Sequence, residues 1–256
     1  MVESRAFNMD CMDALKDFPD KYFDLCAADP PYGLNITGRH RGEAADTHTH
    51  THTHTPRARI GSSKPFGSKG DGVRRKCESV IEANFYPVFD DSSPPDAEVF
   101  RELERVSRKL IIWGGNFFLD HLGAASCMIV WDKKRRGMSQ ADCEIAWTNL
   151  PGQSRIIEYK WNGMLQEDMK HKEERIHATQ KPVALYSYLY RLAKLKPGDK
   201  VLDPYLGSGS SRIAAYDMGL DFTGYEIDPT YFALEEERFA RHTAQMNLFV
   251  DELTAH

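Results

Sequence analysis

The sequence predicts an α/β protein built on a doubly wound, mostly parallel sheet, and three observations support this fold class. First, short apolar runs typical of buried strands alternate with segments of helical periodicity. Second, two of these runs end abruptly, residues 22–28 at a Pro-Pro pair and residues 200–203 at a glycine-rich turn. Third, the chain has 256 residues, of which 41% are hydrophobic, enough for the core of one large domain.

The individual elements follow from the same patterns in chain order. The expected strands are residues 5–9, 22–28, 109–113, 127–131, 144–147, 155–159, 200–203 and 222–226. The expected helices are residues 12–18, 97–108, 183–194, 208–218 and 229–245. In the second of these helices, Val99, Leu103 and Val106 recur at the spacing that places them on one face. Strands alternating with helices predict parallel pairing with crossover helices.

A loop of an acid, two prolines and an aromatic residue follows the strand 22–28. It consists of Asp29, Pro30, Pro31 and Tyr32. Prolines stiffen the backbone, and the carboxyl edge of a parallel sheet is where α/β folds bind their ligands. The loop is therefore a candidate catalytic site, and the alternative is a Pro-Pro turn with an exposed tyrosine.

A glycine turn after the strand 200–203 is the second candidate. Gly207 and Gly209 permit close backbone approach, and the following helix would offer free N–H groups. Glu226 ends the next strand, where an acid can bind two ribose hydroxyls. Together with Asp203 these residues predict an adenosyl ligand, and the alternative is helix capping by surface acids.

These segments together resemble S-adenosylmethionine-dependent DNA methyltransferases that act on amino groups. Residues 29–32 resemble the catalytic motif in its adenine-N6 form, and residues 203–210 resemble the motif Asp-Pro-Phe-x-Gly-Ser-Gly-Thr, with Tyr205 and Ser210 as mild departures. Residues 177–182 resemble the segment His-Pro-Thr-Gln-Lys-Pro, and residues 8–11 resemble a Gly-Asp-Cys element. The resemblance covers residues 6–32 and 98–246, and the middle is similar to small phage and prophage members.

The resemblance implies a Rossmann-like methyltransferase fold in circularly permuted, beta-type order, since the catalytic motif precedes the cofactor motif. One domain, residues 1–256, is expected. Its parts are a catalytic segment (1–32), a flexible basic insertion (33–79), a central sheet with a short recognition region (80–176) and a cofactor-binding half (177–256).

The resemblance also implies the roles of individual residues. Asp29 and the Pro30 carbonyl would accept the N6–H groups of adenine, and Tyr32 would stack on the flipped base. The implied contacts of S-adenosylmethionine are Asp10, Cys11, Asp29, Lys181, Asp203, Tyr205, Gly207, Ser208, Gly209, Ser210, Glu226 and Ile227. A helix-start role for Lys181 is equally open. Trp113 and Trp131 are expected in the core, and Glu144 receives no catalytic role.

Charge distribution suggests where double-stranded DNA would bind. The net charge is −5, yet residues 39–76 contain nine Lys and Arg against three acids, a balance of +6. The candidate DNA contacts are Arg39, Arg41, Arg74, Arg75, Lys133, Lys134, Arg135 and Arg136. The alternative is solvated charge on loops.

Other features bound the function. The Thr-His repeat 47–55 contains four histidines without an acidic or cysteine partner, which favours a dispensable expansion, and no metal is expected. Five scattered cysteines without a CxxC pair indicate reduced thiols and a cytoplasmic protein. No apolar stretch is long enough to cross a membrane.

Three alternatives to adenine-N6 methylation of DNA stay open. The first is cytosine-N4 methylation, whose chemistry is alike. The second is methylation of RNA or protein glutamine, against which Asp29 argues because those enzymes more often carry Asn there. The third is a catalytically silent DNA-binding relative. The target sequence, a homodimer and a partner restriction endonuclease are not decided by the sequence.

Overall fold

A computed structural model describes residues 2–34, 91–137, 141–162 and 165–254. Its main sheet has eight strands in the order β1-β10-β9-β2-β3-β5-β4-β6. All neighbouring strands are parallel except for the pairs that β5 makes with β3 and β4. The strands are β1 (Ser4–Asn8), β2 (Leu25–Ala28), β3 (Leu110–Trp113), β4 (Cys127–Asp132), β5 (Cys143–Thr148), β6 (Arg155–Glu158), β9 (Lys200–Asp203) and β10 (Asp221–Glu226).

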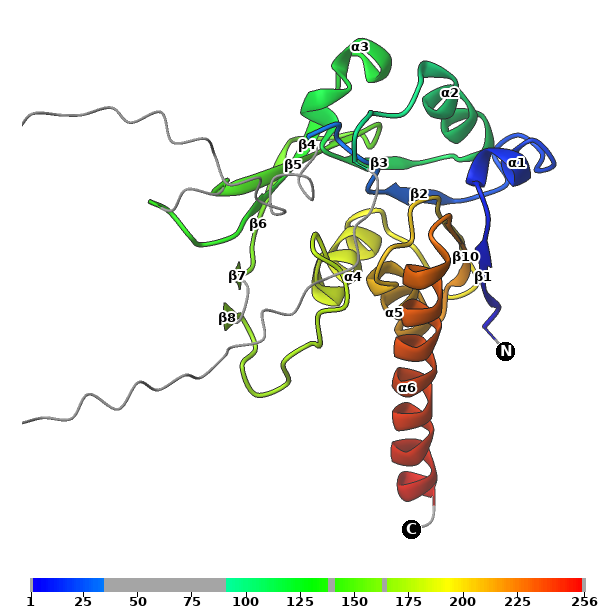
Figure 1. Ribbon diagram of the computed structural model, residues 1–256, viewed down its shortest axis with the longest axis vertical. Helices are drawn as coiled ribbons and strands as arrows, with labels where there is room; N and C mark the ends of the chain where they lie inside the picture. Colours follow the sequence, from blue (N-terminus) through cyan, green and yellow to red (C-terminus); the bar gives the residue numbers. More distant parts are fainter. Residues whose placement is uncertain (1, 35–90, 138–140, 163–164, 255–256) are drawn as a thin grey trace, which may run out of the picture.

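The helices form a layer on each side of the sheet (Figure 1). On one side lie α1 (Cys11–Leu15), α2 (Ala97–Val106) and α3 (Leu119–Leu122). On the other lie α4 (Val183–Leu192), α5 (Ser210–Asp217) and α6 (Pro229–Thr254). This three-layer arrangement confirms the expected α/β class with a doubly wound, mostly parallel sheet.

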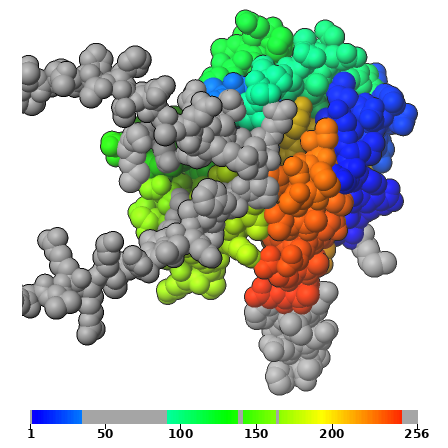
Figure 2. Space-filling view, in the orientation of Figure 1, coloured from blue at the N-terminus to red at the C-terminus, as the bar shows by residue number. Residues whose placement is uncertain are grey.

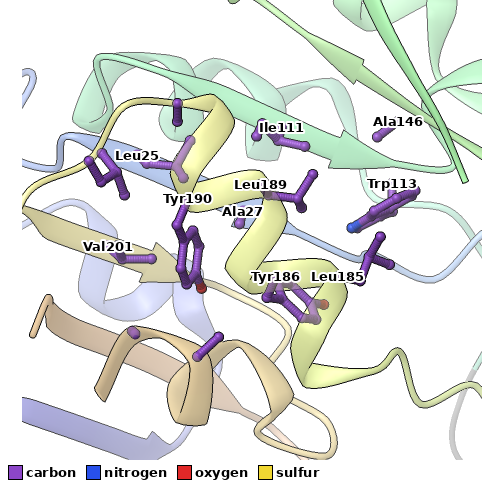
Figure 3. Close-up of a cluster of buried hydrophobic side chains, with 14 of the residues drawn as sticks. Leu25, Ala27, Ile111, Trp113, Ala146, Leu185, Tyr186, Leu189, Tyr190 and Val201 are labelled. Atoms are coloured by element: carbon purple, nitrogen blue, oxygen red, sulfur yellow. The ribbon is translucent and has the colours of Figure 1, made fainter. Parts of the chain in front are cut away.

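Strand β2 shows how one sequence serves two cores. Leu25 and Ala27 belong to the cluster under α4 and α5, whereas Cys26 and Ala28 belong to the cluster under α1 and α2. All four are fully buried, as expected for a central parallel strand covered on both faces. Figure 3 shows the first cluster, in which Leu185 and Leu189 of α4 lie beside the side chains of β2 and β3.

The first strand of the chain lies against its C-terminal half. Strand β1 pairs with β10, so that Ser4 is opposite Phe222 and Asn8 is opposite Glu226. In the space-filling view the N-terminal segment, in blue, borders α6, in orange (Figure 2). Arg212 of α5 joins these parts, because its guanidinium donates to Ser4 Oγ at 3.1 Å and also pairs with Glu235.

The structure contains elements that the sequence patterns did not predict. They are the 3-10 turn η1 (Gly115–Phe117), helix α3, and the hairpin β7 (Trp161–Asn162) and β8 (Leu165–Gln166). Helix α6 continues to Thr254 instead of ending near residue 245. The short elements carry too few residues for a periodic pattern to emerge. Apart from Gly33 and Leu34, the proposed insertion 33–79 falls outside the described residues, as does the whole Thr-His repeat.

Within the described part of the chain, no helix combines the length and the apolar character needed to span a membrane. The same residues contain no group of three or more His, Cys, Asp or Glu side chains able to hold a metal ion.

Candidate active site

Three parallel strands bring the candidate residues to one edge of the sheet. Strands β2, β9 and β10 run in the same direction. Asp29 directly follows β2, Asp203 ends β9 and Glu226 ends β10. The carboxyl edge is where open α/β sheets bind ligands. Two motifs far apart in the sequence therefore share one site.

The loop 29–32 is held in place by hydrogen bonds. The Tyr32 hydroxyl donates to Asp29 Oδ1 at 2.7 Å. The backbone N–H groups of Tyr32 and Gly33 donate to Asp91 Oδ1 at 2.8 and 3.0 Å. Asp91 is only 3% exposed, so a buried carboxylate from a distant segment fixes the end of the loop. Sequence reasoning missed Asp91.

The ring of Tyr32 lies between other parts of the chain. It stacks on Phe117 with ring centroids 5.2 Å apart and planes inclined by 23°. Gly114 has a φ of +66°, and a Cβ there would lie 2.3 Å from Tyr32 Cε1. Only glycine meets both conditions without strain. Phe117 itself is 49% exposed, so its outer surface is available beside the Tyr32 ring that it covers.

Asp29 belongs to a cluster of two carboxylates and two ammonium groups. Lys181 pairs with Asp29 Oδ2 and lies 3.2 Å from Glu144 Oε2. Lys133 pairs with Glu144 Oε1. The four charges come from the end of β2, from β5, from the residue after β4 and from the residue before the Pro182 cap of α4. We call Asp29, Glu144, Lys133 and Lys181 the charge cluster.

Burial and pairing act in opposite directions within the charge cluster. Burial raises the pKa of the Asp29 carboxyl, and the Lys181 ammonium opposes that rise. Burial also acts to raise the pKa of Glu144, but the ammonium groups of Lys181 and Lys133 lower it to about 2. Burial acts to lower the pKa of Lys181, yet Asp29 and Glu144 outweigh it and raise that pKa. Lys181 therefore keeps its proton inside the site.

The turn after β9 is stabilised mainly by neighbours in sequence. Asp203 is 1% exposed. Its Oδ1 accepts the backbone N–H of Tyr205 at 3.0 Å, and its Oδ2 accepts the Ser211 hydroxyl. Burial raises the pKa of Asp203 to about 7. Asp203 thus shapes the turn from inside rather than capping a surface helix.

Glu226 faces the same turn from β10. Its Oε2 accepts the N–H of Gly207 at 2.8 Å, and its Oε1 accepts the N–H of Asp228 at 2.9 Å. An ionised carboxylate has about four acceptor positions, and the backbone N–H of Ile227 is a third donor to Glu226, so at least one position is left for a hydroxyl group of a ligand. Ile227, the next residue, is 68% exposed and offers apolar surface beside it.

Helix α6 supports the turn from behind. Arg238 donates to the Ser208 carbonyl at 2.6 Å and to Ser210 Oγ at 2.9 Å. Gly209 has a φ of +72°, and a Cβ there would lie 2.5 Å from Glu235 Cγ. Sequence reasoning missed Arg238, because a lone arginine in a long helix carries no local signal.

Asp10 and Cys11, which were expected to contact the cofactor, each have a structural role in this fold. Asp10 caps α1 by accepting the N–H of Met12 at 2.9 Å. Cys11 is 5% exposed, and burial raises the pKa of its thiol to about 12. A thiol of that kind is not a nucleophile at neutral pH.

Of the eight expected DNA contacts, four lie outside the described residues and four have partners within the chain. Arg39, Arg41, Arg74 and Arg75 lie outside the described residues. Lys133 was expected to contact DNA, but it is buried against Glu144 because that carboxylate provides the partner that a buried ammonium requires. In the same run Lys134 pairs with Glu167 at 3.3 Å, Arg136 pairs with Asp132 at 2.7 Å, and Arg135 donates to the Ala141 carbonyl at 3.1 Å.

Glu144 is the main site residue that the sequence reasoning passed over. Trp113 and Trp131 are both buried as expected, and each has a lysine ammonium over its ring, at 5.3 Å for Lys181 and 4.8 Å for Lys133. The signal that could have found Glu144 is its place in an apolar strand, where a buried acid needs a cationic partner.

This arrangement, an acidic loop beside a glycine turn at one sheet edge, defines a nucleotide-type ligand site on a Rossmann-like sheet. Residues 130–237 match the N6_N4_Mtase family model, described as DNA methylase. The matched segment contains Lys133, Glu144, Lys181, the glycine turn and Glu226, but begins at residue 130 and so excludes the loop 29–32.

Two relatives share sequence with this chain. It is 23% identical over 254 residues to the Type II methyltransferase M.HinfI of Haemophilus influenzae, covering 90% of this chain and 66% of that protein. It is 35% identical over 78 residues to the Type II methyltransferase M2.DpnII of Streptococcus pneumoniae, covering 30% of this chain and 28% of that protein. The chain therefore spans just under two thirds of the first relative's length and less than a third of the second's.

Two solved structures share the fold. TTHA0409 of Thermus thermophilus, described as a putative DNA modification methylase, has a TM-score of 0.51 at 19% identity, covering 93% of this chain and 95% of that one. The PvuII DNA methyltransferase, described as cytosine-N4-specific, has a TM-score of 0.51 at 12% identity, covering 93% and 87%. The sheet and its helices accordingly form the Rossmann-like methyltransferase fold expected from the sequence.

Proposed function

We propose that the protein is an S-adenosylmethionine-dependent DNA methyltransferase that modifies the exocyclic N6 amino group of adenine. The observation that carries this proposal is the fixed position of Asp29, at the same sheet edge as the glycine turn and Glu226. The match of residues 130–237 to a DNA methylase family supports the reaction class. The Asp-Pro-Pro-Tyr loop supports adenine as the base.

The residues of the glycine turn fit S-adenosylmethionine. The remaining acceptor capacity of Glu226 suits ribose hydroxyls, and the exposed Ile227 suits an aromatic ring. Gly207 presents bare backbone at φ +53°, with nothing nearer than 4.0 Å to a Cβ placed there. When bound, this cofactor would supply an electrophilic methyl group on a positively charged sulfur.

The loop 29–32 would prepare the amino group. The lone pair of an aromatic amine is delocalised into the ring, so it must be localised before it can attack. Asp29 would accept one N6–H and the Pro30 carbonyl the other, which favours a tetrahedral nitrogen with its lone pair directed at the methyl group. As the new N–C bond formed, the bond from the methyl group to sulfur would break and leave a neutral thioether, and the nitrogen would lose a proton that the Asp29 carboxylate is placed to accept.

The base would have to leave the duplex to reach this loop. Tyr32 is already hydrogen-bonded to Asp29 and stacked on Phe117. We therefore assign Tyr32 a positioning contribution in addition to contact with the base, and Phe117 offers the exposed aromatic surface.

Mass spectrometry of nucleosides tests the proposal. Purified protein, S-adenosylmethionine and unmethylated DNA should yield N6-methyladenine, and Asp29→Ala should yield none. If N4-methylcytosine were found instead, the target base would be cytosine and not adenine. No modified base despite measurable cofactor binding would contradict the enzyme assignment and favour a silent DNA-binding relative.

DNA binding is proposed for the basic residues that the sequence singles out between positions 39 and 76. The double variant Arg74→Ala/Arg75→Ala should raise the KM for DNA and flatten its dependence on salt, because phosphate contacts release counterions. The matched control is Arg191→Ala/Lys196→Ala, which removes two exposed charges at positions that the sequence does not single out for DNA binding. Deletion of residues 47–55 should leave activity unchanged. An equal KM in the Arg74/Arg75 variant and wild type would refute the assignment.

A further inference from the structure

Lys181 occupies an unusual position for a lysine. It is only 4% exposed, and its ammonium lies against the rings of Trp113 and Tyr32, with centroids at 5.3 and 5.8 Å. A buried ammonium is retained only where it is paired. Its oxygen neighbours in the described structure are Asp29, Glu144 and, at 3.4 Å, the Tyr32 hydroxyl.

The backbone around Lys181 is fixed on both sides. The carbonyl of Gln180 accepts the indole N–H of Trp161 at 2.7 Å, and the Gln180 side chain accepts the N–H of Ile176 at 2.9 Å. Pro182 then caps α4. The main chain therefore fixes the position of the Lys181 side chain. Only its ammonium group can shift between the carboxylates of Asp29 and Glu144.

The two carboxylates hold the ammonium unequally. Asp29 Oδ2 accepts a hydrogen bond from Lys181. Glu144 Oε2 lies 3.2 Å away as an ion-pair partner, yet it is buried and accepts no hydrogen bond within the described residues. Lys133 anchors the other oxygen, Oε1. Glu144 Oε2 therefore already lies within ion-pair distance of the ammonium that Asp29 also binds, and it has no other donor within the described residues.

The present contacts of Asp29 would compete with a substrate. Its Oδ1 accepts the Tyr32 hydroxyl and its Oδ2 accepts Lys181. A carboxylate has about four acceptor positions, so an incoming amino group would either share one of these oxygens with its present donor or displace that donor. Lys181 can yield without losing all its pairing, because Glu144 is within reach, whereas leaving a buried charge unpaired is strongly unfavourable.

We propose that Lys181 is a positioning residue shared by two acids: it keeps the Asp29 carboxylate ionised and fixed while no base is bound, and Glu144 retains its ammonium when a substrate amino group takes its place on Asp29. This inference rests on the proposed function, since it assigns Asp29 as the acceptor of an amino group. In this proposal Glu144 and Lys133 act through Lys181 and not by contact with the substrate.

The groups that face Asp29 determine the direction of each effect. They are Lys181 before α4, Tyr32 of its own loop, Glu144 of β5, Tyr186 of α4 and Asp203 of β9, while Lys133 after β4 acts on Glu144. Lys181 favours the ionised form of Asp29, and Glu144 disfavours it. Removing Lys181 leaves two carboxylates and one ammonium, and Glu144 keeps Lys133, so Asp29 is the acid that takes up a proton.

The test is the pH profile of kcat/KM for DNA in four variants. Lys181→Met should move the acidic limb upward by about one to two pH units, as expected for loss of an adjacent cation. Lys181→Arg should restore it. Glu144→Gln should move the limb downward, and Lys181→Met/Glu144→Gln should return it part of the way, since the two changes act on one carboxylate. Lys16→Met, at an exposed site paired with Asp13 at 3.9 Å, is the control.

A second measurement does not depend on turnover. The Asp29 carboxyl carbon can be titrated by NMR after ¹³C labelling of aspartate, with Asp29→Asn identifying the signal. Its apparent pKa should rise in Lys181→Met and fall in Glu144→Gln. If the wild type methylates DNA but neither the pH profile nor the titration moves, the inference about Lys181 is wrong. If the titration moves as described while the wild type methylates nothing, the pairing of Lys181 with Asp29 is supported and the proposed function fails.

Discussion

The loop after β2 and the turn after β9 end neighbouring parallel strands, yet the chain stabilises their two aspartates in different ways. Asp203 is bound by Tyr205 and Ser211, two and eight residues away. Asp29 is bound by Tyr32 and by Lys181, which is 152 residues away. The first carboxylate belongs to a local unit of strand, turn and helix, and the second belongs to an assembly of distant segments.

This difference has a functional consequence. An aspartate whose partners are its near neighbours in sequence holds one geometry, which suits the binding of a constant ligand. A carboxylate surrounded by charges from β4, β5 and the start of α4 responds to each of them, which suits a group that must change partners during a reaction. We expect changes at the turn to alter cofactor affinity and changes at the loop to alter rate.

The largest expected effect separates the two regions directly. Asp29→Ala should lower kcat by about 10²- to 10³-fold, because it removes an acceptor aimed at the reacting nitrogen. Its Kd for S-adenosylmethionine should change far less than kcat, because most of the implied cofactor contacts lie at the turn after β9 and at Glu226, although Asp29 is one of them. Isothermal titration and steady-state kinetics measure both quantities.

The reciprocal variant is Glu226→Gln, which loses one charged acceptor and should raise that Kd by about tenfold, with kcat at saturating cofactor near the wild-type value. Asp17→Asn, at an exposed position, serves as the control for both. Equal losses of kcat and affinity in the two variants would mean that loop and turn are not separate functional units.

A glycine substitution tests whether the loop depends on tight packing. Gly114→Ala places a Cβ 2.3 Å from Tyr32 Cε1 at a φ of +66°. Displacing Tyr32 should disturb Asp29, so kcat should fall by about tenfold or more, since small displacements of positioned groups cost much rate.

Gly123→Ala provides the matched control, because its φ is +69° but a Cβ there has no atom within 4 Å. It should cost about 1 kcal/mol of unfolding free energy from backbone strain alone, without a change in kcat. If both alanine variants retain full kcat, contact between Gly114 and Tyr32 has no part in the reaction.

Burial of Asp203 in the turn should make the free energy of unfolding depend on pH. Burial raises the pKa of Asp203 to about 7, from an ordinary value of 3.8. Between these values the folded chain binds a proton that the unfolded chain has released, so this group lowers the free energy of unfolding as pH rises from about 4 to 7. Asn does not titrate there, and Asp203→Asn should therefore gain stability relative to wild type as pH increases.

The difference between variant and wild type should grow by about 2 to 4 kcal/mol between about pH 4 and 8 in urea denaturation, since one pKa unit corresponds to about 1.4 kcal/mol. His177, whose pKa burial lowers to about 4, is present in both proteins, so its opposite trend cancels in the difference. A difference that does not change with pH would show that Asp203 is ionised in the folded protein throughout.

The contrast between the two regions also explains what the sequence could predict. Strand β9, the turn and α5 are contiguous, so the pattern of apolar run, glycines and acid predicted them closely. The pairing of Asp29 with Lys181, and of Glu144 with Lys133, depends on how β4 and β5 reach the sheet, and β5 runs antiparallel to its neighbours. No local periodicity contains that information.

Lys133, and Phe117 with Gly114, are two further cases in which distant contacts decide what the local sequence could not predict. Lys133 belongs to a run of four basic residues, and a run of charge usually indicates a solvated surface, but pairing with one acid on the adjacent strand buries it. Phe117 and Gly114 lie in and beside the short turn η1, which carries too few residues to be predicted. Both shape the loop 29–32 through contacts that only the folded chain creates.

The smallest expected effect concerns Phe117, whose 49% exposure leaves its outer surface free beside Tyr32. Phe117→Ala should raise the KM for DNA by about fivefold, the lower end of what stacking on a base contributes, and should leave the Kd for S-adenosylmethionine unchanged. Leu119→Ala, at a residue 50% exposed in the adjoining helix α3, is the matched control and should change neither quantity.

Fluorescence of 2-aminopurine at the target position adds a direct measurement of the same contact. A flipped base that stacks on Phe117 is quenched, so the signal should brighten in the alanine variant. Identical fluorescence in Phe117→Ala and wild type would assign base contact to Tyr32 alone.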